Sequence, residues 1–200
     1  MELILLSSPV SIPDEITRLN DYFHRGLKRF HLRKPYYSLE KTESFLEQID
    51  PQFYPYIALH SHHSLGEKFG LKRLHYPEDL RNITPKETLT GKVAEGKVIS
   101  TSVHSIENLK KLSPIFSYAF VGPVFPSISK IGYGDPFDPE KWLKIKNSST
   151  SAIAIGGINS QNIQNTKKLG FKGAALLGTI WSQPHDSAIE EFTDCLHHIQ

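Results

Sequence analysis

The strongest constraint on the fold of this chain is an alternation between short apolar segments and longer helix-like ones. Eight short runs rich in apolar or β-branched residues predict strands, at 3–6, 29–33, 56–60, 73–76, 98–101, 118–122, 152–156 and 173–178. Strands that alternate with amphipathic helices are typical of parallel βαβ units. Eight such units predict an α/β fold, a closed (β/α)8 TIM barrel that is compact because the chain has only 200 residues.

Local signals predict where several helices begin and end. Pro13 stands at an N1-like position and Gly26 at a stop, whereas Ser38 and Ser105 are predicted N-caps. A further helix is predicted over 159–170, from an asparagine to a glycine.

The fourth unit is the weakest part of the pattern. Residues 77–97 show only a ragged helical pattern, and their structure is left open. A flavodoxin-like open sheet is the alternative to the barrel. Because no linker, low-complexity segment or repeat divides the chain, residues 1–200 are expected to form one domain.

Composition excludes several classes of function. Lysine and arginine number 23 against 21 acidic residues, so the net charge of +2 predicts no pull onto nucleic acid or a membrane. Cys195 is the single cysteine, which excludes an intrachain disulfide and suits a reducing cytosol. The opening "MELILLSSP" is too short in its apolar part for a signal peptide or membrane span, and a cytoplasmic protein is expected. A homodimer is left open, since many barrels dimerise.

Glycines follow the last two predicted strands. In barrels the active site lies where strands end, and the loops after strands seven and eight often bind phosphate. Gly156 and Gly157 follow the seventh strand and Gly178 the eighth, which predicts a phosphate site. The alternative is that these glycines only make tight turns.

Cations and hydroxyls follow strands six and two. After strand six, Ser127 and Ser129 can donate hydrogen bonds and Lys130 can neutralise an oxyanion, unless the loop is simply exposed. After strand two, Arg33 and Lys34 suit phosphate or carboxylate, and a salt bridge to a strand-end acid is the alternative.

Histidines follow strands five and three. Ser102 and His104 place a candidate general acid–base near the mouth, with a helix-capping or solvent-facing histidine as the alternative. His60, His62 and His63 have no Cys or Glu partner at zincin spacing, so no metal site is assigned to them and their role is left open.

Together these segments resemble the thiamin phosphate synthase/TenI family, from the second strand to the last helix. The strand-two motif R-x-K is similar to "RKP", the strand-five motif S-x-H to "SVH", and the strand-four motif to "GLKRLH". The motif G-P-V-F-x-T-x-T-K is similar to "GPVFPSISK", and A-I-G-G-I to "AIGGI". The resemblance implies a (β/α)8 barrel.

The resemblance also implies a reaction. The synthase joins a hydroxymethylpyrimidine diphosphate to a thiazole phosphate and releases pyrophosphate, with Mg²⁺ bridging the diphosphate oxygens. On this resemblance the segment 127–130 would hold pyrophosphate, with Lys130 as its cation, and Gly156 and Gly157 would bind the thiazole phosphate. A departing polyanion needs cations and a hard metal more than a base.

The chain departs from the synthase pattern at the metal ligands. Where the synthase has an aspartate after strand three, this chain has Ser61 and His62, which are poor Mg²⁺ ligands. The second family aspartate would fall on Glu78 or Asp79, and the strand-two lysine is displaced, with Lys34 beside its place. Mg²⁺ is therefore expected only if synthase activity is retained.

The TenI branch of the family needs less of the site. It isomerises a thiazole carboxylate phosphate to the aromatic tautomer without metal or diphosphate, and His104 matches its catalytic histidine position. The residues retained favour this tautomerase, with thiamin phosphate synthase as the alternative. A third alternative is a non-catalytic barrel that binds a phosphate ester and regulates a partner. A sugar-phosphate isomerase is not expected, because no strand-end carboxylate pair stands out.

Overall fold

The protein is a closed barrel of eight parallel strands. The computed structural model describes residues 1–126 and 138–199. Each strand pairs with the next along the chain, and β8 pairs back with β1, so the predicted (β/α)8 barrel is confirmed and the open-sheet alternative is wrong. The strands are β1 (Glu2–Leu6), β2 (Phe30–Leu32), β3 (Ile57–Leu59), β4 (Arg73–Tyr76), β5 (Val98–Val103), β6 (Tyr118–Val121), β7 (Ser151–Ile155) and β8 (Gly173–Leu176).

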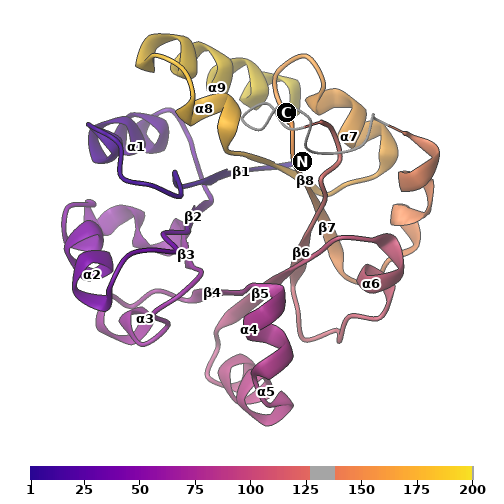
Figure 1. Ribbon diagram of the computed structural model, residues 1–200, viewed down its shortest axis with the longest axis horizontal. Coiled ribbons are helices and arrows are strands. Elements are labelled where there is room, and N and C mark those ends of the chain that lie inside the picture. The colour runs from indigo at the N-terminus through magenta and orange to yellow at the C-terminus, as the bar shows by residue number, and fades with distance from the viewer. Residues whose placement is uncertain (127–137, 200) are drawn as a thin grey trace.

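The helices surround the ring of strands (Figure 1). The α-helices are α1 (Glu15–His24), α2 (Leu39–Glu47), α3 (Leu65–Lys68), α4 (Glu78–Ile83), α5 (Lys86–Ala94), α6 (Ile106–Lys110), α7 (Ile163–Leu169), α8 (Gly178–Trp181) and α9 (His185–Ile199). Two 3-10 helices are η1 (Pro51–Tyr56) and η2 (Glu140–Asn147). The segment 77–97, left open by the sequence, forms the two short helices α4 and α5.

Most of the predicted helix boundaries are confirmed. Ser38 Oγ accepts a hydrogen bond from Lys41 N at 3.2 Å, and Ser105 Oγ accepts one from Asn108 N at 3.1 Å, so both serines cap helices. Gly26 has a φ of 103°, a left-handed conformation that glycine adopts without strain at the end of a helix.

Two predicted helix starts are wrong. Pro13 precedes the helix, because α1 begins at Glu15 and Asp14 is its N-cap with a φ of 54°. The helix predicted from Asn159 begins at Ile163 instead. The Asn159 side chain accepts hydrogen bonds from Gln161 N and Asn162 N at 3.1 Å, which holds this segment in a turn before α7.

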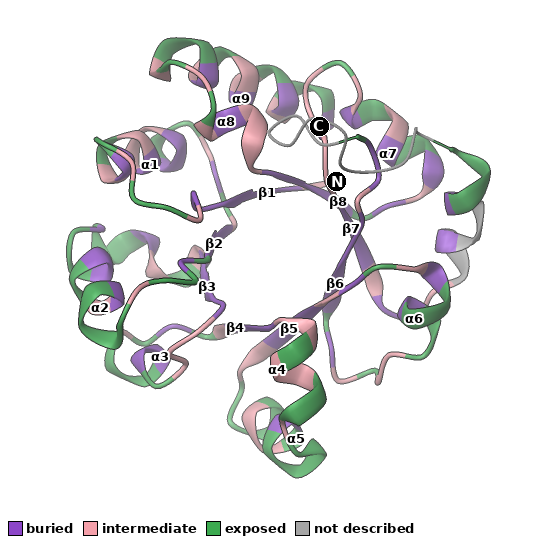
Figure 2. Ribbon diagram, viewed as in Figure 1, coloured by how far each residue is buried: buried purple, intermediate pink, exposed green. Residues whose placement is uncertain are grey.

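Burial follows the two layers of the barrel. Apolar side chains between the strands and the helices form the larger core, and the outward faces of the helices are exposed (Figure 2). Inside the ring lies a smaller apolar cluster, formed by Ile4, Leu6, Tyr118, Phe120, Ile153 and Ala175. Three histidines of the interior are also buried: His31, His60 and His75. One side of the barrel interior is therefore polar.

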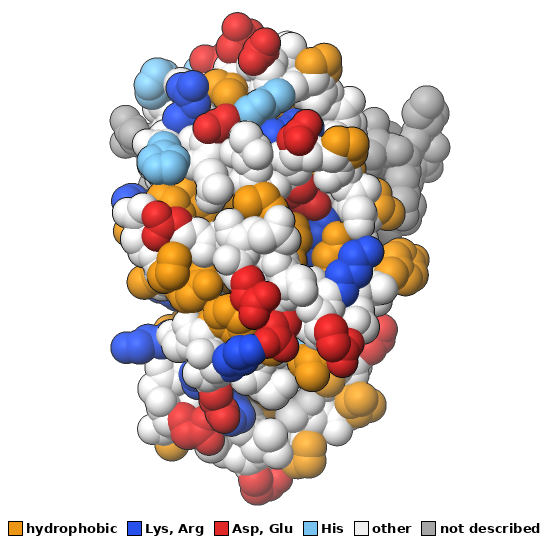
Figure 3. All heavy atoms as spheres, turned by 90° about the vertical axis from the view of Figure 1, so that its left-hand side faces the viewer, with side chains coloured by type: hydrophobic (Ala, Val, Ile, Leu, Met, Phe, Trp, Pro, Cys, Tyr) orange, Lys and Arg blue, Asp and Glu red, His pale blue; other side chains and the backbone are white. Residues whose placement is uncertain are grey.

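The face that carries α1 and α2 carries charged, polar and hydrophobic side chains together (Figure 3). Basic and acidic side chains are interspersed over it (Figure 3). In the described part of the chain, no helix has the length and apolar character needed to span a bilayer.

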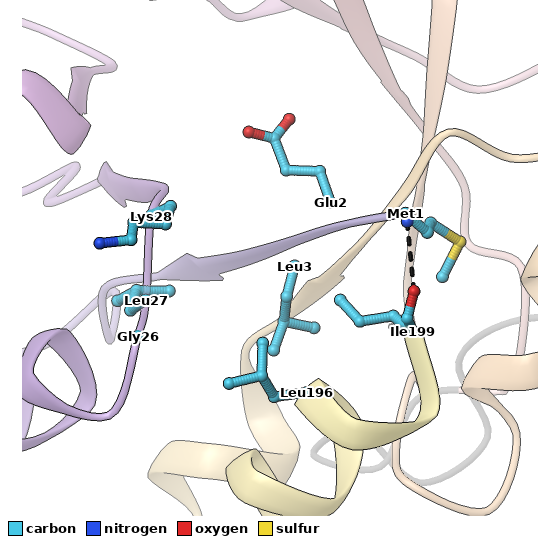
Figure 4. A pocket seen from close by; sticks show the side chains of 8 residues that line it. All are labelled: Met1, Glu2, Leu3, Gly26, Leu27, Lys28, Leu196 and Ile199. Carbon is cyan, nitrogen blue, oxygen red and sulfur yellow. Dashed lines mark hydrogen bonds between the residues drawn. The ribbon is translucent and has the colours of Figure 1, made fainter.

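A cavity of about 400 Å³ lies at the end of the barrel where the strands begin (Figure 4). Its walls come from the start of β1, the segment before β2 and the end of α9, and the Met1 amino group donates to the Ile199 carbonyl at 3.2 Å. This contact ties the two ends of the described chain together, and in barrels this face serves stability.

Candidate functional site

A second cavity, of about 250 Å³, lies at the carboxyl ends of the strands. The residues that line it come from β1 and from the strand ends that follow it: Leu6, Arg33, His60, His75, Pro77, Glu78, Asp79, Ser102, His104, Phe120 and Ile155. Six of the residues singled out from the sequence therefore meet in one pocket, on the face where barrels carry their active sites.

His104 has two different partners for its two ring nitrogens. Nδ1 lies 3.3 Å from the Gly122 carbonyl oxygen, and Nε2 lies 3.6 Å from Glu78 Oε2. A carbonyl only accepts, so Nδ1 carries a proton and Nε2 is the atom that can take up or release one. The ring is mostly exposed to the pocket, with 66% of the side chain accessible. This arrangement can perform general acid–base chemistry.

Glu78 is held in place by Arg81. The two side chains form an ion pair at 3.0 Å within the first turn of α4, and Arg81 also donates to Thr101 Oγ1 and the Ser102 carbonyl, both at 2.8 Å. The start of α4 is thus fastened to the end of β5, where His104 follows. Asp79, the neighbouring carboxylate, also lines the pocket.

The two cations after β2 point to different places. Ser7 fixes the backbone of Arg33, accepting from its N–H at 2.8 Å, and the Arg33 side chain lines the pocket. Lys34 is buried in an ion pair with Glu15 and donates to the Val10 carbonyl at 2.9 Å. The structure therefore does not bring Lys34 to the pocket.

Burial and the lysine act in opposite directions on Glu15. Loss of solvent raises the pKa of this carboxyl, and the hydrogen bond and charge of Lys34 lower it by less.

The glycine pair after β7 lets two loops approach closely. Gly156 has a φ of 97° and Gly157 a φ of 61°, and a Cβ atom on Gly157 would lie 2.2 Å from the Pro126 carbonyl oxygen. The loop after β6 is bonded to this turn through Val124 N, which donates to the Ile155 carbonyl at 2.9 Å. Close packing of these loops explains both glycines locally.

Of the remaining residues predicted to bind phosphate, the structure describes only Gly178. Gly178 is the first residue of α8, directly after β8. Ser127, Ser129 and Lys130 lie outside the described residues. Phosphate binding by the glycine loops and by 127–130 stays a prediction.

A histidine cluster inside the barrel was not predicted from the sequence. His31 Nδ1 lies 2.8 Å from His60 Nε2, and the rings of His60 and His75 stack with centroids 4.0 Å apart. The triplet at 60–63 is split, because His62 Nε2 contacts the Tyr37 carbonyl and His63 Nε2 the carbonyls of Leu59 and His75. The signal that could have revealed the cluster is that His31 on β2 and His75 on β4 occupy inward-facing positions of their strands.

The buried histidines are electrically neutral. Burial, with a smaller contribution from nearby positive groups, lowers the pKa of His31 and of His60 well below the usual value. The same causes lower the pKa of His75 to about 3. At neutral pH each ring therefore offers a nitrogen lone pair.

The fold and the pocket define a (β/α)8 barrel with a pocket lined by histidines and carboxylates at the carboxyl ends of its strands, and comparisons give its family. A sequence profile described as thiamine monophosphate synthase matches residues 13–180. The chain belongs to this family of thiamin-biosynthesis enzymes.

Individual relatives are similar in sequence to this chain over shorter stretches. The thiamine-phosphate synthase of Staphylococcus carnosus is 31% identical over 94 residues, 46% of this chain and 44% of that protein. That of Clostridium tetani is 34% identical over 104 residues, 50% of this chain and 49% of that protein. The matched stretches thus span about half the length of these relatives.

Solved structures agree over the whole chain. Thiamine phosphate pyrophosphorylase from Bacteroides thetaiotaomicron superposes with a TM-score of 0.80 at 27% identity, covering 100% of this chain and 98% of that one. The pyrophosphorylase from Pyrococcus furiosus also gives 0.80, at 17% identity over 99% and 95% of the two chains, which supports the fold alone.

Among the described residues, the pocket offers carboxylate ligands for a Mg²⁺ ion from one segment of the chain. Its two carboxylates, Glu78 and Asp79, come from one segment, and Glu78 is already paired with Arg81. Ser61 and His62, which follow β3, are not among the residues that line this pocket, and the His62 ring bonds to the Tyr37 carbonyl at 2.9 Å. Mg²⁺ is usually held by one or two carboxylates together with substrate phosphates, so Glu78 and Asp79 are the pocket residues that would hold it beside a phosphorylated substrate.

Proposed function

We propose that this chain is a tautomerase of the thiamine monophosphate synthase family, which converts a thiazole carboxylate phosphate to its aromatic tautomer. The observation that carries the proposal is the placement of His104 in the pocket, with Nδ1 on the Gly122 carbonyl and Nε2 toward Glu78. Tautomerisation needs one group that removes a proton and returns it, and His104 is suited to both steps.

The proton transfer is balanced within the substrate. His104 Nε2 takes a proton from one ring atom of the thiazole as the double bonds shift, and the imidazolium delivers a proton at another atom. No atom or electron is gained or lost. Glu78, 3.6 Å from Nε2, stabilises the imidazolium that exists between the two steps.

The other pocket residues fit the charges of such a substrate. Arg33 extends a guanidinium into the pocket and can bind the substrate carboxylate through two hydrogen bonds. Ser102 Oγ lies 3.0 Å from His75 Nε2 and holds the pocket wall below His104. In this proposal the loops at Gly156, Gly157 and Gly178 bind the substrate phosphate through backbone N–H groups.

Thiamin phosphate synthase is the second candidate. The sequence "GPVFPSISK" and the carboxylate of Asp79 in the pocket favour it. The pairing of Glu78 with Arg81 and the burial of Lys34 count against it, because both groups are engaged away from a diphosphate. The proposed substrates of either reaction are small molecules, and we keep the cytoplasm as the proposed compartment.

A variant of His104 tests the proposal. We expect His104→Gln to lower kcat for aromatisation by about 10²–10⁴-fold, the usual contribution of a general acid–base. His197→Gln, an exposed histidine on α9, is the matched control and should leave kcat unchanged. Equal activity of the two variants would refute the role of His104, and a folded wild type that binds the substrate without turnover would identify a regulatory barrel.

A further inference from the structure

Three histidines from neighbouring strands converge below the pocket. His31 lies on β2, His60 directly after β3 and His75 on β4, and none of them serves the proton transfer proposed for His104. One nitrogen from each ring lies within 4.8 Å of the other two. Strand order in the barrel brings them together, since β2, β3 and β4 are adjacent.

The separations are close to those of a three-histidine metal site. Tetrahedral ligands with metal–nitrogen bonds of about 2.0–2.1 Å lie about 3.4 Å from one another. His31 Nδ1 and His60 Nε2, at 2.8 Å, need to part by a few tenths of an ångström. The third nitrogen, on His75, has to move inward by about 1.4 Å at most and to exchange its bond with a serine hydroxyl for the metal ion.

One ring nitrogen of the cluster is unsatisfied. His60 Nδ1 is buried and has no hydrogen-bond partner in the described part of the chain, and His60 itself is 6% exposed. This nitrogen is a second candidate ligand atom of the His60 ring beside Nε2, because a buried polar atom without a partner is costly and a bound ion would satisfy it.

The surroundings of the rings suit metal ligation. His31 Nε2 lies 2.7 Å from the Tyr118 hydroxyl, and His75 Nδ1 lies 3.0 Å from Ser100 Oγ. Because a hydroxyl both donates and accepts, the His31 proton can sit on Nε2 and leave Nδ1 free for a metal ion. Partners of this kind fix the tautomer and orientation of histidine ligands.

The charges around the pocket also permit a dication. Arg33 is the cation that lines the pocket, and Glu78 and Asp79 line it with two carboxylates. His60 and His75 line the pocket floor, whereas His31 is fully buried beneath them. A metal ion at the cluster would therefore face the pocket.

We propose that His31, His60 and His75 bind one divalent transition-metal ion of the Zn²⁺ class, with a fourth coordination position open to the pocket. Imidazole ligands select Zn²⁺, Co²⁺ and Ni²⁺ over Mg²⁺ and Ca²⁺. The site is separate from the carboxylates discussed for Mg²⁺, and it does not depend on which reaction the enzyme catalyses.

Metal binding to the purified protein tests the site directly. The protein is first stripped with a chelator and then titrated with Zn²⁺ at pH 7.5 by calorimetry, and with Co²⁺ by visible absorption. We expect one ion per chain and the intense Co²⁺ bands of a four- or five-coordinate site. Mg²⁺ at the same concentration should give no signal.

Variants separate this site from adventitious surface binding. His60→Leu removes one ligand and should abolish the Co²⁺ bands, whereas His197→Leu, on the surface of α9, should retain them. Tyr118→Phe removes the hydroxyl beside His31 and should weaken Zn²⁺ binding by about 10–100-fold, as outer-shell changes do. Circular dichroism confirms that each variant is folded.

A measurement on the wild type covers the case in which His60→Leu does not fold. Nitrogen chemical shifts of the imidazole rings are recorded by NMR with and without one equivalent of Zn²⁺, and we expect large changes for three of the ten histidines. No binding, binding of Zn²⁺ that His60→Leu leaves intact, or shifts confined to exposed histidines would each overturn the proposal.

Discussion

Removal of Lys34 should destabilise the protein through Glu15. The ammonium and the carboxylate are buried, with 1% and 4% of their side chains exposed, and they pair with each other. Removing one partner of a buried pair leaves an uncompensated charge and costs about 3–5 kcal/mol. Lys34→Met also leaves the Val10 carbonyl without this donor.

The expected loss of stability can be converted to a change in Tm. For a domain of this length, 1 kcal/mol shifts Tm by about 2–4 °C, so Lys34→Met should lower Tm by about 6–20 °C at pH 8. Glu15→Gln in the same chain removes the charge and should recover most of the loss. Substrate KM of the double variant should equal that of wild type, because Lys34 lies outside the pocket.

The pH dependence identifies Glu15 as the cause. Burial already raises the pKa of Glu15, and loss of Lys34 removes two influences that lower it. A carboxyl with a raised folded pKa contributes stability that is present below its unfolded pKa and is lost as pH rises through the folded value. The deficit of Lys34→Met relative to wild type should therefore shrink from pH 8 to pH 5.

Urea unfolding of wild type, Lys34→Met and the double variant at pH 5, 6.5 and 8 measures these differences. A deficit below about 1 kcal/mol, the range of exposed ion pairs, would refute the buried pair. A deficit that is equal at all three pH values, or that Glu15→Gln does not relieve, would also refute it.

Three further predictions follow from other parts of the structure. In the presence of a chelator, acidification from pH 7 to 5.5 should lower the free energy of unfolding by about 1.2 kcal/mol for each buried histidine ring such as His75. The reason is that a histidine with a lowered pKa contributes stability that is lost as pH falls below its unfolded pKa. Urea midpoints that do not change over this range would contradict the neutral cluster. Gly157→Ala should cost about 1–3 kcal/mol or more, since φ is 61° and the added Cβ meets the Pro126 carbonyl, and thermal unfolding like that of wild type would disprove the close packing. Arg33→Met should raise KM for the thiazole carboxylate phosphate at least about tenfold with little change in kcat, because Arg33 binds the substrate equally in the ground state and the transition state. An unchanged KM would show that Arg33 does not bind the substrate.

The barrel could be predicted because its signals are local. Each strand is a short apolar run, and caps such as Ser38 and Ser105 act within one turn of their helix. The segment 77–97 could not be predicted, because α4 buries no residue and α5 buries only Leu89, so neither has a clear apolar face.

The site was predictable only where position along a strand was enough. Arg33 and His104 follow strand ends and Ser102 lies near the end of β5, and all three reach the pocket. The side to which Lys34 turns depends on Glu15, which is 19 positions away on α1. Such tertiary pairings leave no local pattern in the chain.

The histidine cluster shows the same limit. In the sequence, His60 looks like a member of the local group "HSHH", but its ring partners are His31 and His75, on other strands. Only closure of the barrel brings these three side chains together, so their shared chemistry is visible in the structure and not in the spacing.

The measurement that tests the central claim most directly is a paired turnover assay of the wild-type protein. One arm supplies the thiazole carboxylate phosphate in the presence of a chelator, and the other supplies pyrimidine diphosphate, thiazole phosphate and Mg²⁺. We expect aromatisation in the first arm at a rate that chelator does not reduce, and little thiamin phosphate in the second. Mg²⁺-dependent formation of thiamin phosphate without aromatisation would contradict this expectation and assign the pocket to the synthase.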